Sequence, residues 1–181
     1  MKSIFFILNA FLLVLFCSRE QEKIPDTKVS ADEQIISLPT EFQDLIKREF
    51  GPDSFPQGFE EQTGYVFGFL EGDEYVINHV SKNGTHLLWF CKLTHRDEIG
   101  RAFLRILDIV ILPNLASEDQ LLMGNCQYDG EPDPEIISIG RFSSDEAQVK
   151  IKYAWRANRI SKVFEKIPID LVACINETIF L

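Results

Sequence analysis

The chain has 181 residues, 45% of them hydrophobic and 15 of them Phe, so a single domain can bury a sizeable core and global disorder is not expected. Acidic residues outnumber basic ones 28 to 18, which gives a formal net charge of −10. A surface this acidic repels phosphate backbones, so we expect no nucleic-acid partner. Basic partners and divalent cations are favoured only through the long-range field.

Residues 1–16 are typical of a signal peptide. Lys2 supplies a positive charge, and the run from Ile4 to Phe16 is apolar except for Asn9. This run has the length of a signal-peptide apolar region and is too short to span a bilayer as a stable helix. No later stretch reaches the roughly 20 apolar residues of a membrane span. We therefore expect export, followed by release or by tethering at the N-terminus.

The apolar run ends at Cys17, in LVLFC, and the polar stretch SREQEKIPDTKVSADEQ follows. This arrangement resembles the signal peptides of bacterial lipoproteins, in which the cysteine is acylated and becomes the first residue of the mature protein. The resemblance implies a lipid anchor on Cys17 and a polar tether over residues 17–38. Phe16 departs from the small residue usual before that cysteine. The alternatives are a soluble secreted protein cut near Ser18 and an uncleaved anchor.

Residues 39–181 are expected to form one globular β-rich domain. Its first element is predicted to be an amphipathic helix in PTEFQDLIKREFG, with Thr40 as N-cap and Gln43 completing a capping box. Gly51 is the predicted C-terminal stop. The apolar stripe expected to pack on a sheet consists of Phe42, Leu45, Ile46 and Phe50.

From residue 64 on, the chain consists of short β-branched or aromatic segments separated by turn residues. Asn83-Gly84, between two such segments, predicts a two-residue type I′ hairpin in which His79 opposes Leu88. Both faces of this hairpin are largely apolar. We therefore expect it to lie centrally in a sheet that is covered on both sides.

The remaining segments also favour strands. ILDIVIL predicts a strand from Ile106 that stops before Pro113, and DGEPDPE is interpreted as the tip of a second hairpin. VKIKYAWRANRISKVFEKIPI predicts a long strand, a turn over residues 158–161 and a shorter strand. The fold class is mainly β, with α+β possible. An antiparallel sheet, a sandwich and an open barrel of seven to nine strands all remain compatible with the pattern, each with one early amphipathic helix.

Four cysteines are present, and none are spaced as C-x-x-C, which argues against zinc-finger and thioredoxin-like sites. Cys91 lies in the apolar segment LLWFCKL, where a free thiol behaves as a small hydrophobe. The candidate disulfide is Cys126–Cys174. If Cys17 is lipidated, an odd number of cysteines remains, whereas a soluble secreted chain allows two disulfides.

No catalytic motif is present: the chain has no G-x-S-x-G, S-x-x-K or H-E-x-x-H sequence and no Walker loop. We predict no catalytic residues and no cofactor, and leave enzyme status open. A scattered triad of Ser54, His95 and Asp108 has nothing in its favour. His79 and His86 share a face of the hairpin and could share a metal, but no third ligand is identified, so no metal site is predicted.

Trp155 lies beside Arg156 and Arg159 in KYAWRANR. Trp and Arg often dominate binding energy, so these three residues are the candidate contact with a protein or glycan partner. The alternative is a core tryptophan with solvated arginines at a strand end. The pattern AWRANR…VFEKIP…CINE resembles the C-terminal part of cell-envelope lipoproteins of uncharacterised families, a resemblance that implies no activity.

The sequence thus predicts an exported, lipid-anchored protein of the cell envelope with a non-catalytic binding or structural role. Its membrane contact would be the acylated Cys17. The alternative is a soluble secreted or periplasmic inhibitor or ligand carrier that contains disulfides. An envelope hydrolase is the third hypothesis.

Overall fold

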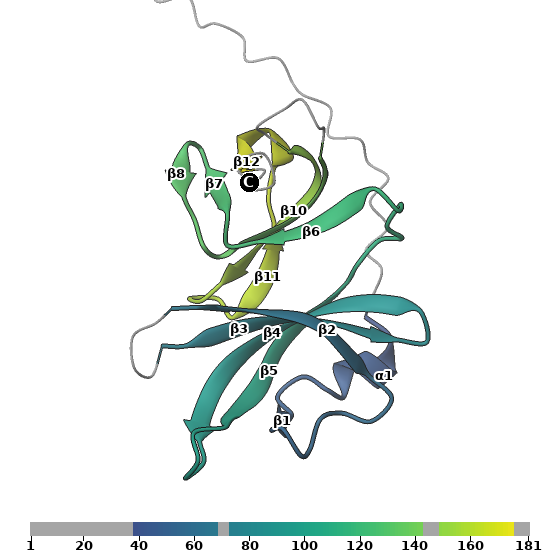
Figure 1. Cartoon of the computed structure of the whole chain (residues 1–181), viewed down its shortest axis with the longest axis vertical. Helices are drawn as coiled ribbons and strands as arrows, with labels where there is room; N and C mark the ends of the chain where they lie inside the picture. Colours follow the sequence, from purple (N-terminus) through teal and green to yellow (C-terminus); the bar gives the residue numbers. More distant parts are fainter. Residues whose placement is uncertain (1–37, 69–72, 143–148, 176–181) are drawn as a thin grey trace, which may run out of the picture. The chain divides into compact units, whose positions relative to one another are not determined.

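A computed structural model describes residues 38–68, 73–142 and 149–175 (Figure 1). The chain divides into two units, Met1–Ile36 and Ser37–Leu181, and all described residues belong to the second. The predicted signal peptide, Cys17 and almost all of the predicted tether lie outside the described residues. Within the part of the chain that the structure describes, no helix has both the length and the apolar character needed to cross a membrane.

The described residues are mainly antiparallel β, with 57% in strands and 5% in helical turns, which confirms the predicted mainly β class. The strands are β1 (Glu49–Phe50), β2 (Glu60–Phe67), β3 (Tyr75–Lys82), β4 (Thr85–Arg96), β5 (Ala102–Ile111), β6 (Asp119–Met123), β7 (Cys126–Tyr128), β8 (Glu131–Pro132), β9 (Ile136–Arg141), β10 (Lys150–Asn158), β11 (Val163–Lys166) and β12 (Val172–Cys174). The helical turns are α1 (Thr40–Gln43) and the 3-10 turn η1 (Ile169–Leu171).

Three sheets are formed by the described strands. Sheet A has the order β1-β5-β4-β3-β2, sheet B the order β11-β10-β9-β6, and sheet C the order β12-β7-β8. The seven to nine strands expected from the sequence fall short of the twelve described here. The difference comes mostly from strands of two or three residues, which are too short to carry a recognisable period.

The hairpin of β3 and β4 follows the predicted register. Asn83 and Gly84 both have positive φ, 50° and 77°, as a type I′ turn requires, and His79 pairs with Leu88. Apolar side chains are buried on both faces of the hairpin, as expected. One face contributes Val80, Leu87, Trp89 and Cys91 to one core cluster, and the other contributes Tyr75, Ile77, Leu88 and Phe90 to a second cluster.

The predicted helix over residues 40–50 is wrong beyond Gln43, where α1 ends, and its N-cap is Pro39, with no side-chain capping hydrogen bond, and not Thr40 as predicted. The chain turns at Lys47, whose φ is 71°, and the Lys47 N–H donates to the carbonyl of Ile106 at 2.7 Å. The Ile106 N–H in turn donates to the carbonyl of Arg48 at 3.0 Å, and β1 pairs with β5. The open edge of β5 therefore satisfies backbone groups that a helix would have satisfied internally. Three side chains of the predicted stripe are nonetheless buried: Phe42, Leu45 and Phe50.

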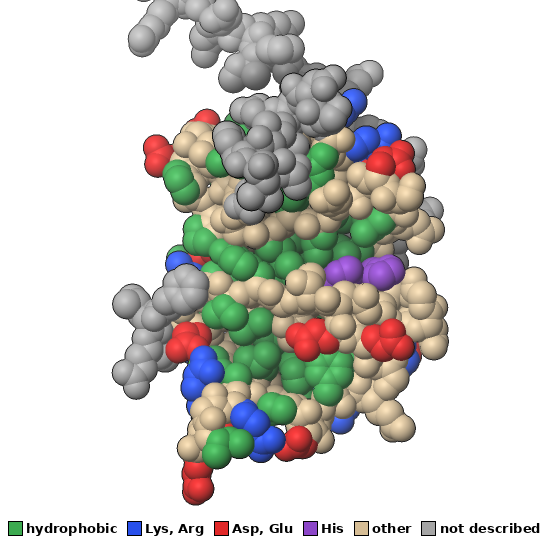
Figure 2. Space-filling view, in the orientation of Figure 1, with side chains coloured by type: hydrophobic (Ala, Val, Ile, Leu, Met, Phe, Trp, Pro, Cys, Tyr) green, Lys and Arg blue, Asp and Glu red, His purple; other side chains and the backbone are tan. Residues whose placement is uncertain are grey.

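The second core cluster joins sheets A and B. Its buried members include Phe67 and Phe90 from sheet A and Ile137 and Trp155 from sheet B. In Figure 1, β6, β10 and β11 lie on one side of β3 and β4, while α1 and β1 lie on the other. Figure 2 shows hydrophobic side chains gathered in a band between the strands of sheet B and those of sheet A, with histidine side chains at one end of the band.

Candidate functional site

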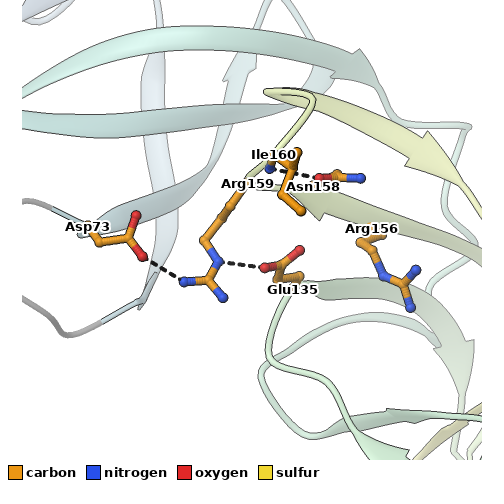
Figure 3. Close-up of a pocket in the computed structure, with 6 residues that line it drawn as sticks. All are labelled: Asp73, Glu135, Arg156, Asn158, Arg159 and Ile160. Carbon is orange, nitrogen blue, oxygen red and sulfur yellow. Dashed lines mark hydrogen bonds and ion pairs between the residues drawn. The ribbon is translucent and has the colours of Figure 1, made fainter.

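A pocket of about 470 Å³ lies where the turn between β10 and β11 meets the segments that precede β3 and β9 (Figure 3). Strand β10 supplies two of its residues, the turn supplies two, and each preceding segment supplies one. The lining residues are Asp73, Glu135, Arg156, Asn158, Arg159 and Ile160.

Asn158 fixes the shape of the turn. Its side-chain Oδ1 accepts the N–H groups of Ile160 at 2.8 Å and Ser161 at 3.1 Å, and its backbone carbonyl accepts the Lys162 N–H at 2.9 Å. Asn commonly stabilises turns in this way, by hydrogen bonding to the backbone a few residues on. The turn leaves the Ile160 side chain 94% exposed beside the pocket.

Arg159 ties together three segments that are distant in sequence. Its Nε donates to Glu135 Oε1 at 2.5 Å, and its Nη1 donates to Asp73 Oδ2 at 2.9 Å. The hydrogen bond to Glu135 is the largest of the causes that raise the pKa of Arg159, so the guanidinium stays charged. Within the described part of the chain, Nη2 of Arg159 makes no hydrogen bond.

Arg156 is held in a similar way. Its Nε and Nη2 both donate to Asp133 Oδ2, at 3.0 and 2.8 Å, and its guanidinium lies 4.6 Å above the centre of the Tyr128 ring. Asp133 Oδ1 accepts the N–H of Glu135 at 2.9 Å, which links the two arginine sites. Nη1 of Arg156 has no hydrogen-bond partner among the described residues. In the view of Figure 3, Glu135 lies between the two guanidinium groups.

The pocket thus presents hydrogen-bond donors and acceptors side by side. Among the described residues, Nη1 of Arg156 and Nη2 of Arg159 donate no hydrogen bond, and one carboxylate oxygen each of Asp73 and Glu135 accepts none. These carboxylates would repel a simple anion, and the guanidinium groups would repel a simple cation. A neutral ligand with adjacent hydroxyl or amide groups can satisfy both kinds of group.

Of the predicted partner contact, only the arginines line this pocket. Trp155 is 8% exposed and belongs to the core cluster between sheets A and B, which is the alternative that the sequence left open. Sequence reasoning missed Asp73 and interpreted Glu135 as part of a solvated hairpin tip. No local signal marks either residue, because only the fold brings them to Arg159.

The structure joins Cys126 and Cys174, the candidate pair, in a disulfide between residues that face each other across β7 and β12. Cys91 is a free thiol with 0% exposure, and burial raises its pKa far above the ordinary value. Cys17 lies outside the described residues.

The scattered triad does not form a hydrogen-bonded unit in the described structure. Ser54 Oγ accepts the Gly51 N–H, His95 stacks on Phe103, and Asp108 Oδ2 accepts the Phe164 N–H. Over residues 38–68, 73–142 and 149–175, no group of three or more His, Cys, Asp or Glu side chains is placed to hold a metal ion.

No protein-family model matches the chain, and it matches none of the curated proteins or solved structures with which it was compared. The chemistry of the pocket and the N-terminal sequence are therefore the features that point to a function.

Proposed function

We propose that this chain is an exported protein of the cell envelope, anchored by lipid on Cys17, whose β-rich domain binds a glycan without catalysis. The binding site would be the pocket around Arg156 and Arg159. The observation that carries the proposal is the mixture, in that pocket, of guanidinium N–H groups and carboxylate oxygens that have no hydrogen-bond partner among the described residues.

A glycan suits this mixture because each hydroxyl group can donate one hydrogen bond and accept others. The charges also nearly cancel, since two guanidinium groups lie among the carboxylates of Asp73, Asp133 and Glu135. An anionic ligand would in addition approach a chain with a net charge of −10. The ion pairs hold both guanidinium groups in place before binding, which lowers the entropic cost of forming a complex.

The accounting of cysteines supports the lipid anchor. Cys126 and Cys174 are joined to each other, and a disulfide is typical of exported proteins. Cys91 is fully buried, so a bond from it to Cys17 would require the core to open. A second disulfide within the chain would thus need a cysteine from the core, which favours acylation over the soluble carrier with two disulfides.

Binding can be tested with the detergent-solubilised full chain on an array of neutral, acidic and amino oligosaccharides. Losing a hydrogen bond to a charged group costs about 1.5–3 kcal/mol, so Arg156→Gln and Arg159→Gln should each weaken binding about ten- to hundredfold. The matched control is Arg101→Gln. Arg101 is 41% exposed and forms ion pairs with Asp97 and Asp53, but it does not line the pocket.

Two results would contradict the proposal: no oligosaccharide retained by the wild-type chain, or equal retention by the pocket variants and the Arg101 control. Melting temperatures of all variants show whether the fold is kept. Ile160→Ser provides a further variant, since this exposed side chain forms part of the lining but belongs to no core cluster among the described residues.

A further inference from the structure

His79 and His86 form a contact that the proposed glycan site does not use. They project from neighbouring strands, His79 opposite Leu88 and His86 opposite Ser81, so they are diagonal neighbours on one face of sheet A. His79 Nε2 lies 3.0 Å from His86 Nδ1, and the ring centres are 5.1 Å apart. Two nitrogens that can each carry a lone pair are therefore held facing each other.

This separation fits two ligands of one metal ion. Zinc–nitrogen bonds of about 2.0–2.1 Å place two ligand nitrogens about 3.3 Å apart in a tetrahedral site. Adjacent positions of a square-planar copper site with similar bond lengths place them about 2.9 Å apart. The observed 3.0 Å lies between these values, so rotation of both rings, which turns their lone pairs toward one point beside the N–N line, would admit either ion.

We propose that His79 and His86 together bind one divalent ion of the zinc or copper class, with water in the remaining coordination positions. Imidazole nitrogen is a preferred ligand of both metals. The sequence pattern alone yielded no third ligand, and two protein ligands define an open site. Such a site binds its ion exchangeably and leaves positions for a ligand from a partner or a small molecule.

The surroundings leave room for those further ligands. Both histidines are only partly buried. His86 also lines a second pocket, of about 520 Å³, which is bounded by Gly84 of the turn, by Thr85 at the start of β4 and by the segment 111–115. Histidine side chains reach the surface at the end of the apolar band in Figure 2. The net charge of −10 favours the approach of a cation at long range.

Besides this rotation of the rings, metal binding needs a change of tautomer when both rings are neutral. In the metal-free pair, one ring donates its N–H to the facing nitrogen of the other. On binding, that proton moves through solvent to the far nitrogen of the same ring. Each facing nitrogen then offers its lone pair to the ion. A neutral pair thus releases no net proton, and each ring keeps one N–H.

The test is titration of Cu²⁺ and, separately, Zn²⁺ into the full chain carrying Cys17→Ala in detergent. This variant leaves no accessible thiol, because Cys91 is fully buried and the other two cysteines are joined. We expect one equivalent of either ion to bind, and the electron paramagnetic resonance spectrum of the Cu²⁺ form to show two imidazole nitrogens. His79→Gln and His86→Gln should each weaken binding at least tenfold.

His95→Gln is the matched control, because the third histidine of the chain stacks on Phe103 with ring centres 4.4 Å apart and does not contact the pair. It should bind both ions as tightly as the parent chain. The proposal fails if the parent spectrum shows fewer than two imidazole nitrogens, or if all three variants bind alike. The parent spectrum decides the matter even if a variant does not fold.

Discussion

The disulfide between Cys126 and Cys174 should contribute a large part of the stability of the domain. The two residues are 48 positions apart, and the enclosed segment contains strands β8 to β11. In the loop-entropy model, closing a loop of this length destabilises the unfolded chain by about 4 kcal/mol at 25 °C. Domains of this size have a free energy of unfolding of about 5–15 kcal/mol, so loss of the disulfide should remove a large fraction of it.

The double variant Cys126→Ala/Cys174→Ala removes the link without leaving an unpaired thiol. Its free energy of unfolding, measured with guanidinium chloride, should fall by about 4 kcal/mol. Removal of two buried sulfur atoms adds a packing loss, and Cys91→Ala measures that loss for one fully buried cysteine without a disulfide. If the double variant does not fold, wild-type protein with and without a reductant gives the same comparison.

A double variant whose free energy of unfolding falls by no more than twice the loss caused by Cys91→Ala would contradict this prediction. That outcome would mean that the link does not restrict the unfolded chain. It would leave the segment between the two cysteines held by strand pairing and packing alone.

Three further substitutions test burial, backbone strain and close packing. Burial raises the pKa of Asp108, even though its carboxylate accepts the Phe164 N–H at 2.7 Å. The protonated side chain therefore stabilises the fold. This contribution is fully present when the pH is below the ordinary pKa of the group, and it is lost as the pH rises through the raised value. Asp108→Asn should have the same urea midpoint as wild type at about pH 3.5 and should be the more stable of the two at pH 7. A difference in stability between the two proteins that shrinks as pH rises would contradict this. A Cβ on Gly124, whose φ is 85°, would lie 2.5 Å from the Tyr65 ring, whereas one on Gly130, whose φ is 81°, meets nothing within 4 Å. Gly130→Ala should lower the free energy of unfolding by about 1–2 kcal/mol through left-handed backbone strain, and Gly124→Ala should lower it by about 1–3 kcal/mol more. Equal losses for the two variants in chemical denaturation would contradict the close contact with Tyr65.

The elements that sequence predicts well here are those fixed by neighbouring residues. Asn83 and Gly84 favour positive φ, and the two-residue turn they form sets the register of β3 against β4 residue by residue. The second two-residue turn, at Asp129 and Gly130, carries a similar signal, with φ values of 51° and 81°. The sequence nevertheless indicates only a longer tip there, because β7 and β8, which flank the turn, are three and two residues long.

The elements that sequence predicts badly depend on distant partners. The helix prediction from Thr40 onward is locally consistent, but backbone groups of Ile106 on β5 bind Lys47 and Arg48 instead. A capping box and an apolar stripe contain no information about that edge. Intrinsic helix propensity is weak enough for such tertiary hydrogen bonds to override it.

The residues of the candidate site also fall into those that the sequence could indicate and those that it could not. Arg156 and Arg159 could be singled out because they lie beside a tryptophan in the sequence. Glu135 and Asp73 lie 24 and 86 residues from Arg159, so no pattern within a strand or a turn relates them to it. Trp155 itself belongs to the core between sheets A and B, and the local sequence could not decide between this place and a partner contact.

The lipid anchor on Cys17 can be tested directly by determining the intact mass and N-terminal peptide of the mature protein from its native host, alongside Cys17→Ala. Our account predicts a mature chain that begins at an acylated Cys17, contains one disulfide and one buried thiol, and is lost from membranes in the variant. A chain that begins at Ser18 or later without lipid, with the same distribution as the variant, would contradict it.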